Sequence, residues 1–108
     1  MFDIVKIRAL NDAFRTTLVG GRVMLTSGVR ELGEAGVRRA MVLVSGFIAF
    51  CEDNDPQGEH DFGAFEVEGD KLFWKIDYYD KALEHGSEDP ADPTRTMRVL
   101  TVMLASDY

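Results

Sequence analysis

The stretch from Phe62 to Tyr79 constrains the fold most, because it has the pattern of a β-hairpin. Two runs rich in apolar and aromatic residues, 62–67 and 71–78, are joined by the short polar segment Glu68-Gly69-Asp70. Side chains alternate between the two faces of a strand. In the second run one face would carry Leu72, Trp74, Ile76 and Tyr78, and the other Phe73, Lys75, Asp77 and Tyr79. The sequence therefore predicts an antiparallel hairpin with one strongly apolar face.

Helical spacing of apolar residues predicts two helices before the hairpin. The first covers 3–18, with Asp3 as its N-cap. The second covers 34–51, where apolar residues recur at intervals of three and four. Between them the alternating segment 22–26 predicts a short strand.

The C-terminal segment leaves two possibilities. Asp92-Pro93 is typical of a helix start, which favours a last helix through Met97, Leu100 and Leu104. The alternative is a strand over 98–104, because this stretch is rich in Val, Leu and Thr. With either ending, residues 1–108 are expected to form a single small α+β domain, with helices packed on a short, mostly antiparallel sheet that includes the hairpin.

Length and composition narrow the class of protein further. A chain of 108 residues with 45% apolar residues can build one core. Its apolar runs are too short to span a bilayer, and its first ten residues lack a signal-peptide core, so we expect a cytoplasmic protein without membrane contact. Cys51 is the single cysteine, which excludes an internal disulfide and a multi-cysteine metal site.

Acidic residues are concentrated in the middle of the chain. Residues 51–92 hold fourteen acidic side chains against three lysines, whereas the segments on both sides carry a small positive charge. Such a segment disfavours direct binding of nucleic acid and favours cations or a basic protein surface.

The segment from Asp53 to Asp61 partly matches a calcium-binding loop. Oxygen ligands would come from Asp53, Asp55, Gln57 and Asp61, and Gly58 lies where the sharp turn is needed. The bidentate glutamate that should close the loop is replaced by Ala64. The pattern therefore favours a turn stabilised by Asp and Asn side chains over a calcium site.

A second possible site combines Glu59, His60 and Asp61 with the downstream Asp77 and Asp80. One imidazole and several carboxylates could bind a divalent metal or act as acid and base, which would suit a metal-dependent hydrolase. In an extended chain, however, His60 would point away from Glu59 and Asp61. In the alternative reading a neighbouring carboxylate holds His60, which then organises the loop.

The hairpin could also form a docking surface. If its outer face is open, Phe73 and Tyr79 would be surrounded by carboxylates, a combination that suits a basic partner. In the alternative most of these rings belong to the core. The candidate binding residues are Asp53, Asp55, Glu59, His60, Asp61, Glu66, Glu68, Asp70, Phe73, Asp77, Tyr79 and Asp80.

Several segments along the chain resemble one known family. They are Asn11-Asp12-Ala13-Phe14-Arg15, Gly20-Gly21-Arg22-Val23, Thr26-Ser27-Gly28-Val29, Asp53-Asn54-Asp55-Pro56, Glu59-His60-Asp61-Phe62-Gly63, Trp74-Lys75-Ile76-Asp77-Tyr78-Tyr79-Asp80, Asp89-Pro90-Ala91-Asp92-Pro93 and Arg98-Val99-Leu100-Thr101. The chain resembles a family of small uncharacterised bacterial proteins, classed as a domain of unknown function, with many members on plasmids and other mobile elements. The resemblance implies a bacterial cytoplasmic setting and brings no activity, cofactor or catalytic residue.

Two functions follow as hypotheses. The first is a small acidic interaction module, for instance an inhibitor or modulator whose carboxylates stand in for phosphates on the basic surface of a nucleic-acid enzyme. The second is a metal-dependent hydrolase that uses Glu59, His60, Asp61 and Asp77. The first requires no cofactor, and no motif in the chain indicates one.

Overall fold

A computed structural model describes residues 3–108 and contains one sheet and several short helices. The elements are, in chain order, α1 (Ile4–Thr17), β1 (Gly21–Leu25), α2 (Ser27–Arg30), α3 (Gly33–Ser45), β2 (Phe62–Val67), β3 (Asp70–Tyr79), β4 (Met97–Leu104) and the 3-10 turn η1 (Ala105–Asp107). The strand order is β1-β4-β3-β2. The β1–β4 pair is parallel and the other two pairs are antiparallel, so the predicted α+β fold with a mostly antiparallel sheet is confirmed.

The predicted hairpin is formed by β2 and β3. Phe62 pairs with Lys75 and Val67 with Asp70, so only Glu68 and Gly69 form the turn. Both turn residues have positive φ, 51° and 89°, as a two-residue turn of type I′ requires. Gly69 adopts this conformation at little cost, which explains why the turn lies here.

The predicted C-terminal helix is wrong, and its alternative, a strand, is confirmed. β4 lies between β1 and β3 and pairs with both along most of its length. Its even-numbered residues Arg98, Leu100 and Val102 are buried. Asp92 does not cap a helix; its carboxylate accepts the backbone N–H of Thr94 in a turn. Two neighbouring strands therefore outweigh a local helix-start signal.

The first helix is confirmed, and the second is shorter than predicted. The carboxylate of Asp3 accepts the backbone N–H of Lys6, 3.1 Å away, which caps α1. α3 ends at Ser45 instead of continuing to residue 51. Beyond it, Phe47 and Phe50 leave the helical path and pack edge-on against Trp74, with ring centroids 5.5 and 6.1 Å from it. The short α2 follows β1 directly and was not predicted.

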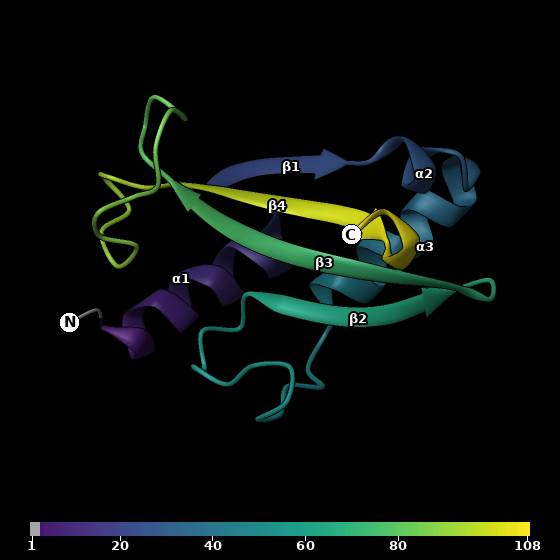
Figure 1. Cartoon of the computed structure of the whole chain (residues 1–108), viewed down its shortest axis with the longest axis horizontal. Coiled ribbons are helices and arrows are strands. Elements are labelled where there is room, and N and C mark those ends of the chain that lie inside the picture. Colours follow the sequence, from purple (N-terminus) through teal and green to yellow (C-terminus); the bar gives the residue numbers. More distant parts are fainter. Residues whose placement is uncertain (1–2) are drawn as a thin grey trace.

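The core lies between the sheet and the helices. α1 and α3 pack on one face of the sheet, behind the strands in Figure 1. The inner face contributes Leu72, Trp74, Ile76, Leu100 and Val102, all buried, as the predicted alternation in β3 requires. On the outer face Tyr108 packs against Phe73 and Phe62, with centroid distances of 5.4 and 6.2 Å.

Arg15 connects the two main helices. Its Nη1 donates to the carbonyl oxygens of Val44 and Phe47, at 2.8 and 2.9 Å, and to that of Ser45 at 3.3 Å. Its Nη2 lies 3.1 Å from a carboxylate oxygen of Asp12. A cation that binds the last carbonyls of α3 offsets the negative end of that helix. The side chain is buried, so these hydrogen bonds are shielded from water.

None of the helices within residues 3–108 has the length and apolar character needed to cross a bilayer.

Candidate functional site

Two loops gather acidic residues at one end of the sheet. Loop 46–61 leads into the start of β2, and loop 80–96 connects the end of β3 to the start of β4 (Figure 1). Together they hold ten of the nineteen acidic residues of the chain but only two of its twelve lysines and arginines, Lys81 and Arg95. We call these two loops the acidic end.

Loop 46–61 is fixed by hydrogen bonds on both sides. The side chain of Asn54 accepts the N–H of Cys51 and donates to the carbonyl of Ala49, at 2.9 Å in both bonds. From α1, Arg8 Nε donates to the carbonyl of Gly58 at 2.7 Å. The predicted turn held by Asp and Asn side chains is confirmed, and the loop has a defined shape.

His60 is held between two carboxylates. Its Nδ1 lies 2.9 Å from Asp12 Oδ1, and its Nε2 lies 3.7 Å from Asp55 Oδ2. The ring stacks on Phe50, with 3.8 Å between centroids. His60 has a φ of 55°, a conformation that residues other than glycine rarely adopt. The alternative reading of His60 as the residue that organises the loop agrees with these contacts.

A second polar network lies beside His60, on Asn11. This fully buried amide donates to the carbonyl of Glu59 at 3.0 Å and to the hydroxyl of Tyr78 at 2.8 Å. The hydroxyl of Tyr78 in turn donates to Glu59 Oε1 at 3.1 Å, and Arg98 Nε donates to Asn11 Oδ1 at 2.7 Å. Burial raises the pKa of Tyr78 above its ordinary value, so the hydroxyl remains a donor. These bonds attach the acidic end to α1 and the sheet.

Among the described acidic residues, Asp61 has the largest shift of its pKa. Burial, followed by the charge of Glu59, raises the pKa of Asp61 from 3.8 to about 6. Asp55 and Asp77 add further repulsion. A carboxyl group that stays protonated to such a pH can exchange protons near neutrality.

The raised pKa of Asp61 predicts a pH-dependent stability. The folded state holds the proton more tightly than the unfolded chain, so this stabilisation is complete below about pH 4 and is lost as the pH rises through about 6. Asp61→Asn, which mimics the neutral form, should raise the free energy of unfolding at pH 8 by about 1 kcal/mol after allowance for solvent screening. Thermal melts should show a Tm gain of roughly 4–8 °C at pH 8 that disappears toward pH 4. Asp53→Asn, on an exposed carboxylate, is the matched control, and an equal gain at both pH values would contradict the prediction.

Loop 80–96 uses several of its acids for its own turns. Asp80 accepts the N–H of Glu84, which lowers the pKa of Asp80. Asp89 and Asp92 accept the N–H groups of Ala91 and Thr94. These three carboxylates therefore stabilise the turns of the loop.

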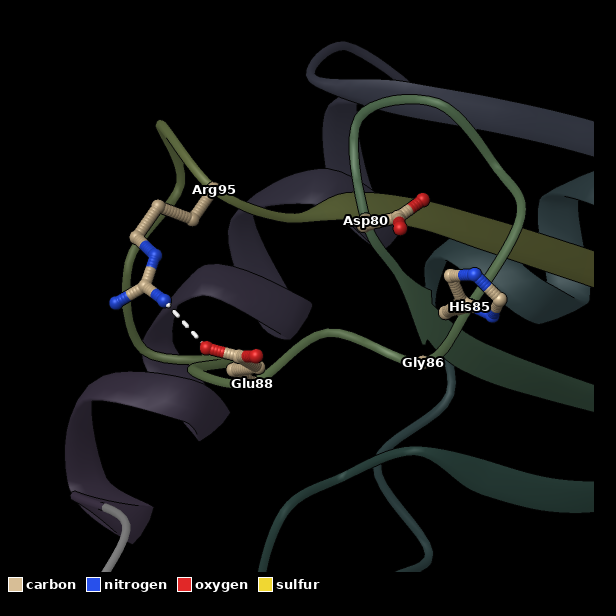
Figure 2. Close-up of a pocket in the computed structure, with 5 residues that line it drawn as sticks. All are labelled: Asp80, His85, Gly86, Glu88 and Arg95. Carbon is tan, nitrogen blue, oxygen red and sulfur yellow. Dashed lines mark hydrogen bonds and ion pairs between the residues drawn. The ribbon is translucent and has the colours of Figure 1, made fainter.

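A hollow of about 420 Å³ opens within loop 80–96. Figure 2 shows Glu88 and Arg95 on one side of it and Asp80, His85 and Gly86 on the other. Arg95 Nη2 lies 2.9 Å from Glu88 Oε2. The arginine is already paired with a carboxylate, so the hollow offers no concentrated charge of one sign.

The candidate binding residues fall into three groups. Asp53, Asp55, Glu59, His60, Asp61 and Asp80 lie at the acidic end. Glu66, Glu68 and Asp70 lie at the hairpin turn, at the opposite end of β3 from loop 80–96. The ten residues of β3 separate the two ends by roughly 30 Å. Phe73, Asp77 and Tyr79 lie on the outer face of the sheet, where Asp77 is 3.0 Å from Lys75 Nζ. The mid-chain acids therefore do not share one surface.

The possible metal site at Glu59, His60, Asp61, Asp77 and Asp80 has no counterpart in the geometry of residues 3–108. Within that range no three His, Cys, Asp or Glu side chains are grouped to hold a metal ion. His60 contacts Asp12 and Asp55, and Asp77 is paired with Lys75. Asp55 also turns its carboxylate inward, with 5% of its side chain exposed, to accept the N–H of His60.

Four polar residues of this region are not among the predicted site residues: Asn11, Asp12, Arg15 and Arg98. One signal was available. Asn11 lies four residues after Ile7 and three before Phe14, so it falls on the buried stripe of α1, where a polar residue needs partners. The partners themselves are 48 to 87 residues away in sequence, so their identity could not be read locally.

A family described as "Protein of unknown function (DUF3768)" matches residues 25–107, most of the chain. The chain belongs to the DUF3768 family. The expected relation to a family of unknown function is thereby confirmed. The DUF3768 match spans both loops of the acidic end and all strands but β1, and it begins after α1. No curated protein and no solved structure matches the chain.

Proposed function

We propose that this DUF3768 protein is a protein-interaction module that binds a basic protein surface through its acidic end. The observation that carries the proposal is the charge of the two loops that adjoin the same end of the sheet, ten acidic side chains against Lys81 and Arg95. A field of one sign over one end accelerates the encounter with a surface of opposite charge and selects against acidic partners.

Only some of the ten acidic side chains in the two loops are exposed and free to contact a partner. Glu52, Asp53, Glu84 and Glu88 are exposed, and of these only Glu88 is paired with an arginine among the described residues. Asp55, Glu59, Asp80, Asp89 and Asp92 are used by internal hydrogen bonds. The proposed contacts therefore involve mainly Glu52, Asp53 and Glu84, while the internally bonded acids add to the field.

The fixed shape of loop 46–61 also supports binding. Asn54, Arg8, Asn11 and His60 hold this loop in place before any partner arrives. A preorganised loop loses little conformational entropy on binding, which favours affinity.

The partner that fits is a protein with a basic groove, such as a nucleic-acid enzyme, in which carboxylates would occupy the positions of phosphates. The protein would then act as an inhibitor or modulator, and carriage on a mobile element would suit that role. The contacts of His60 with Asp12 and Asp55, and of Asp77 with Lys75, lend no support to the hydrolase hypothesis.

Affinity capture at two salt concentrations tests the proposal. The tagged protein should retain a basic partner from a cell lysate at 0.05 M salt and release most of it at about 0.5 M, because exposed charges are then screened over only a few Å. Mass spectrometry identifies the retained protein. Retention that is indifferent to salt, or no specific partner at low salt, would contradict the proposal.

A further inference from the structure

A small cavity of about 130 Å³ lies between α1 and the start of β4, away from loop 46–61. Its walls are mostly apolar and come from α1, the turn before β1, the segment before β4 and β4 itself. The lining residues are Leu10, Ala13, Phe14, Val19, Gly20, Pro93, Thr96 and Arg98. A cavity of about 150 Å³ holds one benzene molecule, so this space fits a small organic molecule.

Among the described residues, Arg98 is the one charged residue that lines this cavity, and it is 3% exposed. Its Nε donates to Asn11 Oδ1 at 2.7 Å, and its Nη2 donates to the carbonyl of Pro90 at 2.5 Å. Within residues 3–108 no carboxylate forms an ion pair with the guanidinium. Burial accordingly lowers the pKa of Arg98 from its ordinary value.

The third guanidinium nitrogen, Nη1, has no hydrogen-bond partner among the described residues. The fully enclosed polar side-chain atoms without a partner in this range are Arg15 Nε, Thr26 Oγ1 and Trp74 Nε1. Arg98 Nη1 is not one of them, and Arg98 forms part of the cavity wall. The ring of Tyr78 lies 5.2 Å from the guanidinium carbon and the charge of Glu59 acts favourably on it, but no carboxylate of residues 3–108 contacts it directly. A buried cation without a direct ion pair is costly, so a bound anion would stabilise the folded state.

We propose that this cavity binds a small aliphatic monocarboxylate of about four to six carbons, whose carboxylate pairs with Arg98 and whose chain lies against Leu10, Phe14 and Val19. A guanidinium is the side chain best suited to a carboxylate. The apolar walls favour burial of a hydrocarbon tail over burial of a second charge. The proposal does not depend on the proposed function, since the docking residues Glu52, Asp53 and Glu84 do not line the cavity.

Titration of valerate into ¹⁵N- and ¹³C-labelled protein at pH 7 tests the proposal by NMR. Saturable shifts are expected at the methyl groups of Ala13 and Val19 and at the backbone of Arg98, with a Kd on the order of 0.1–1 mM for so small a ligand. Pentanol and pentylamine, which keep the chain and lack the negative charge, and acetate, which lacks the chain, should bind at least about tenfold more weakly.

Ala13→Leu is the decisive variant, because Arg98→Gln removes a hydrogen bond to Asn11 and could unfold the protein. Ala13 lines the cavity and is exposed on α1, so we expect a leucine there to occupy part of the space while Arg98 keeps its hydrogen bonds. We expect Ala13→Leu to weaken valerate binding at least about tenfold, whereas Ala35→Leu, on an exposed position of α3, leaves it unchanged. Equal binding of pentanol and valerate, no saturable shift, or full binding by Ala13→Leu would overturn the proposal.

Discussion

Replacing Arg15 with methionine is expected to lower the free energy of unfolding by about 3 to 5 kcal/mol. Methionine can fill much of the same space, but it donates no hydrogen bond to the carbonyls of Val44, Ser45 and Phe47. The end of α3 then loses its cation, and buried acceptors remain without a donor. The stacking of the guanidinium over Trp74 and Phe50, at 5.1 and 5.4 Å from the ring centroids, is lost as well.

Arg38→Met is the matched control for Arg15→Met. Arg38 lies on α3 and pairs with Glu34 at 2.9 Å, but 69% of its side chain is exposed. Its loss should cost at most about 0.5 kcal/mol. Urea denaturation followed by tryptophan fluorescence measures both variants, since Trp74 is the single tryptophan and is fully buried. Similar midpoints for the two variants would contradict the assigned role of Arg15.

The second large effect is expected at Gly63. A Cβ at this position would overlap Trp74 Nε1 and would come within 2.8 Å of Phe47. Both rings are packed in the core beneath β2, so neither can move away without disturbing other contacts. Gly63→Ala should therefore lower the free energy of unfolding by about 2 to 4 kcal/mol, at or above the upper range for overpacking.

Gly46→Ala is the same substitution at a position with room. Its nearest non-neighbouring atom would be the carbonyl oxygen of Val42, at 3.4 Å, and its φ of −94° suits any residue. The change should be neutral or stabilise by a few tenths of a kcal/mol up to about 1 kcal/mol, because alanine restricts the unfolded chain. Chemical denaturation of both variants gives the comparison. A loss at Gly46→Ala as large as that at Gly63→Ala would show that the ring contacts of Gly63 are not the cause.

The hairpin could be predicted because all its determinants are local. Glu68-Gly69 supplies the two positive φ angles, and the alternation from Leu72 to Tyr78 assigns the faces without knowledge of the rest of the fold. α1 could be predicted for the same reason, from the N-cap Asp3 and the apolar stripe that follows it.

β4 could not be assigned from its own residues. Met97–Leu104 is apolar enough for either a helix or a strand, and Asp92-Pro93 imitates a helix start. The deciding interaction is parallel pairing with β1, more than seventy residues earlier in the chain. Such pairing leaves no short-range pattern in a sequence.

The candidate site could be predicted only in part from the sequence. The concentration of acids from 51 to 92 was evident from composition, but their distribution between two ends of the sheet depends on the length and direction of β3. The contact of His60 with Asp12 joins residues 48 apart, and the partners of Asn11 come from loop 46–61, β3 and β4. The sequence indicates that a buried polar residue such as Asn11 needs hydrogen-bond partners, but only the fold identifies them.

The affinity of the captured partner for two triple variants of equal charge is the most direct test of the proposed docking role. One variant, Glu52→Gln with Asp53→Asn and Glu84→Gln, removes three exposed charges from the acidic end. The other, Glu66→Gln with Glu68→Gln and Asp70→Asn, removes three exposed charges from the hairpin turn. We predict that at low salt the first variant binds about tenfold more weakly than the unmodified protein and that the second binds nearly as well. Equal weakening by the two variants would show that net charge alone governs binding, and a larger loss at the hairpin turn would place the docking surface at the opposite end of the sheet.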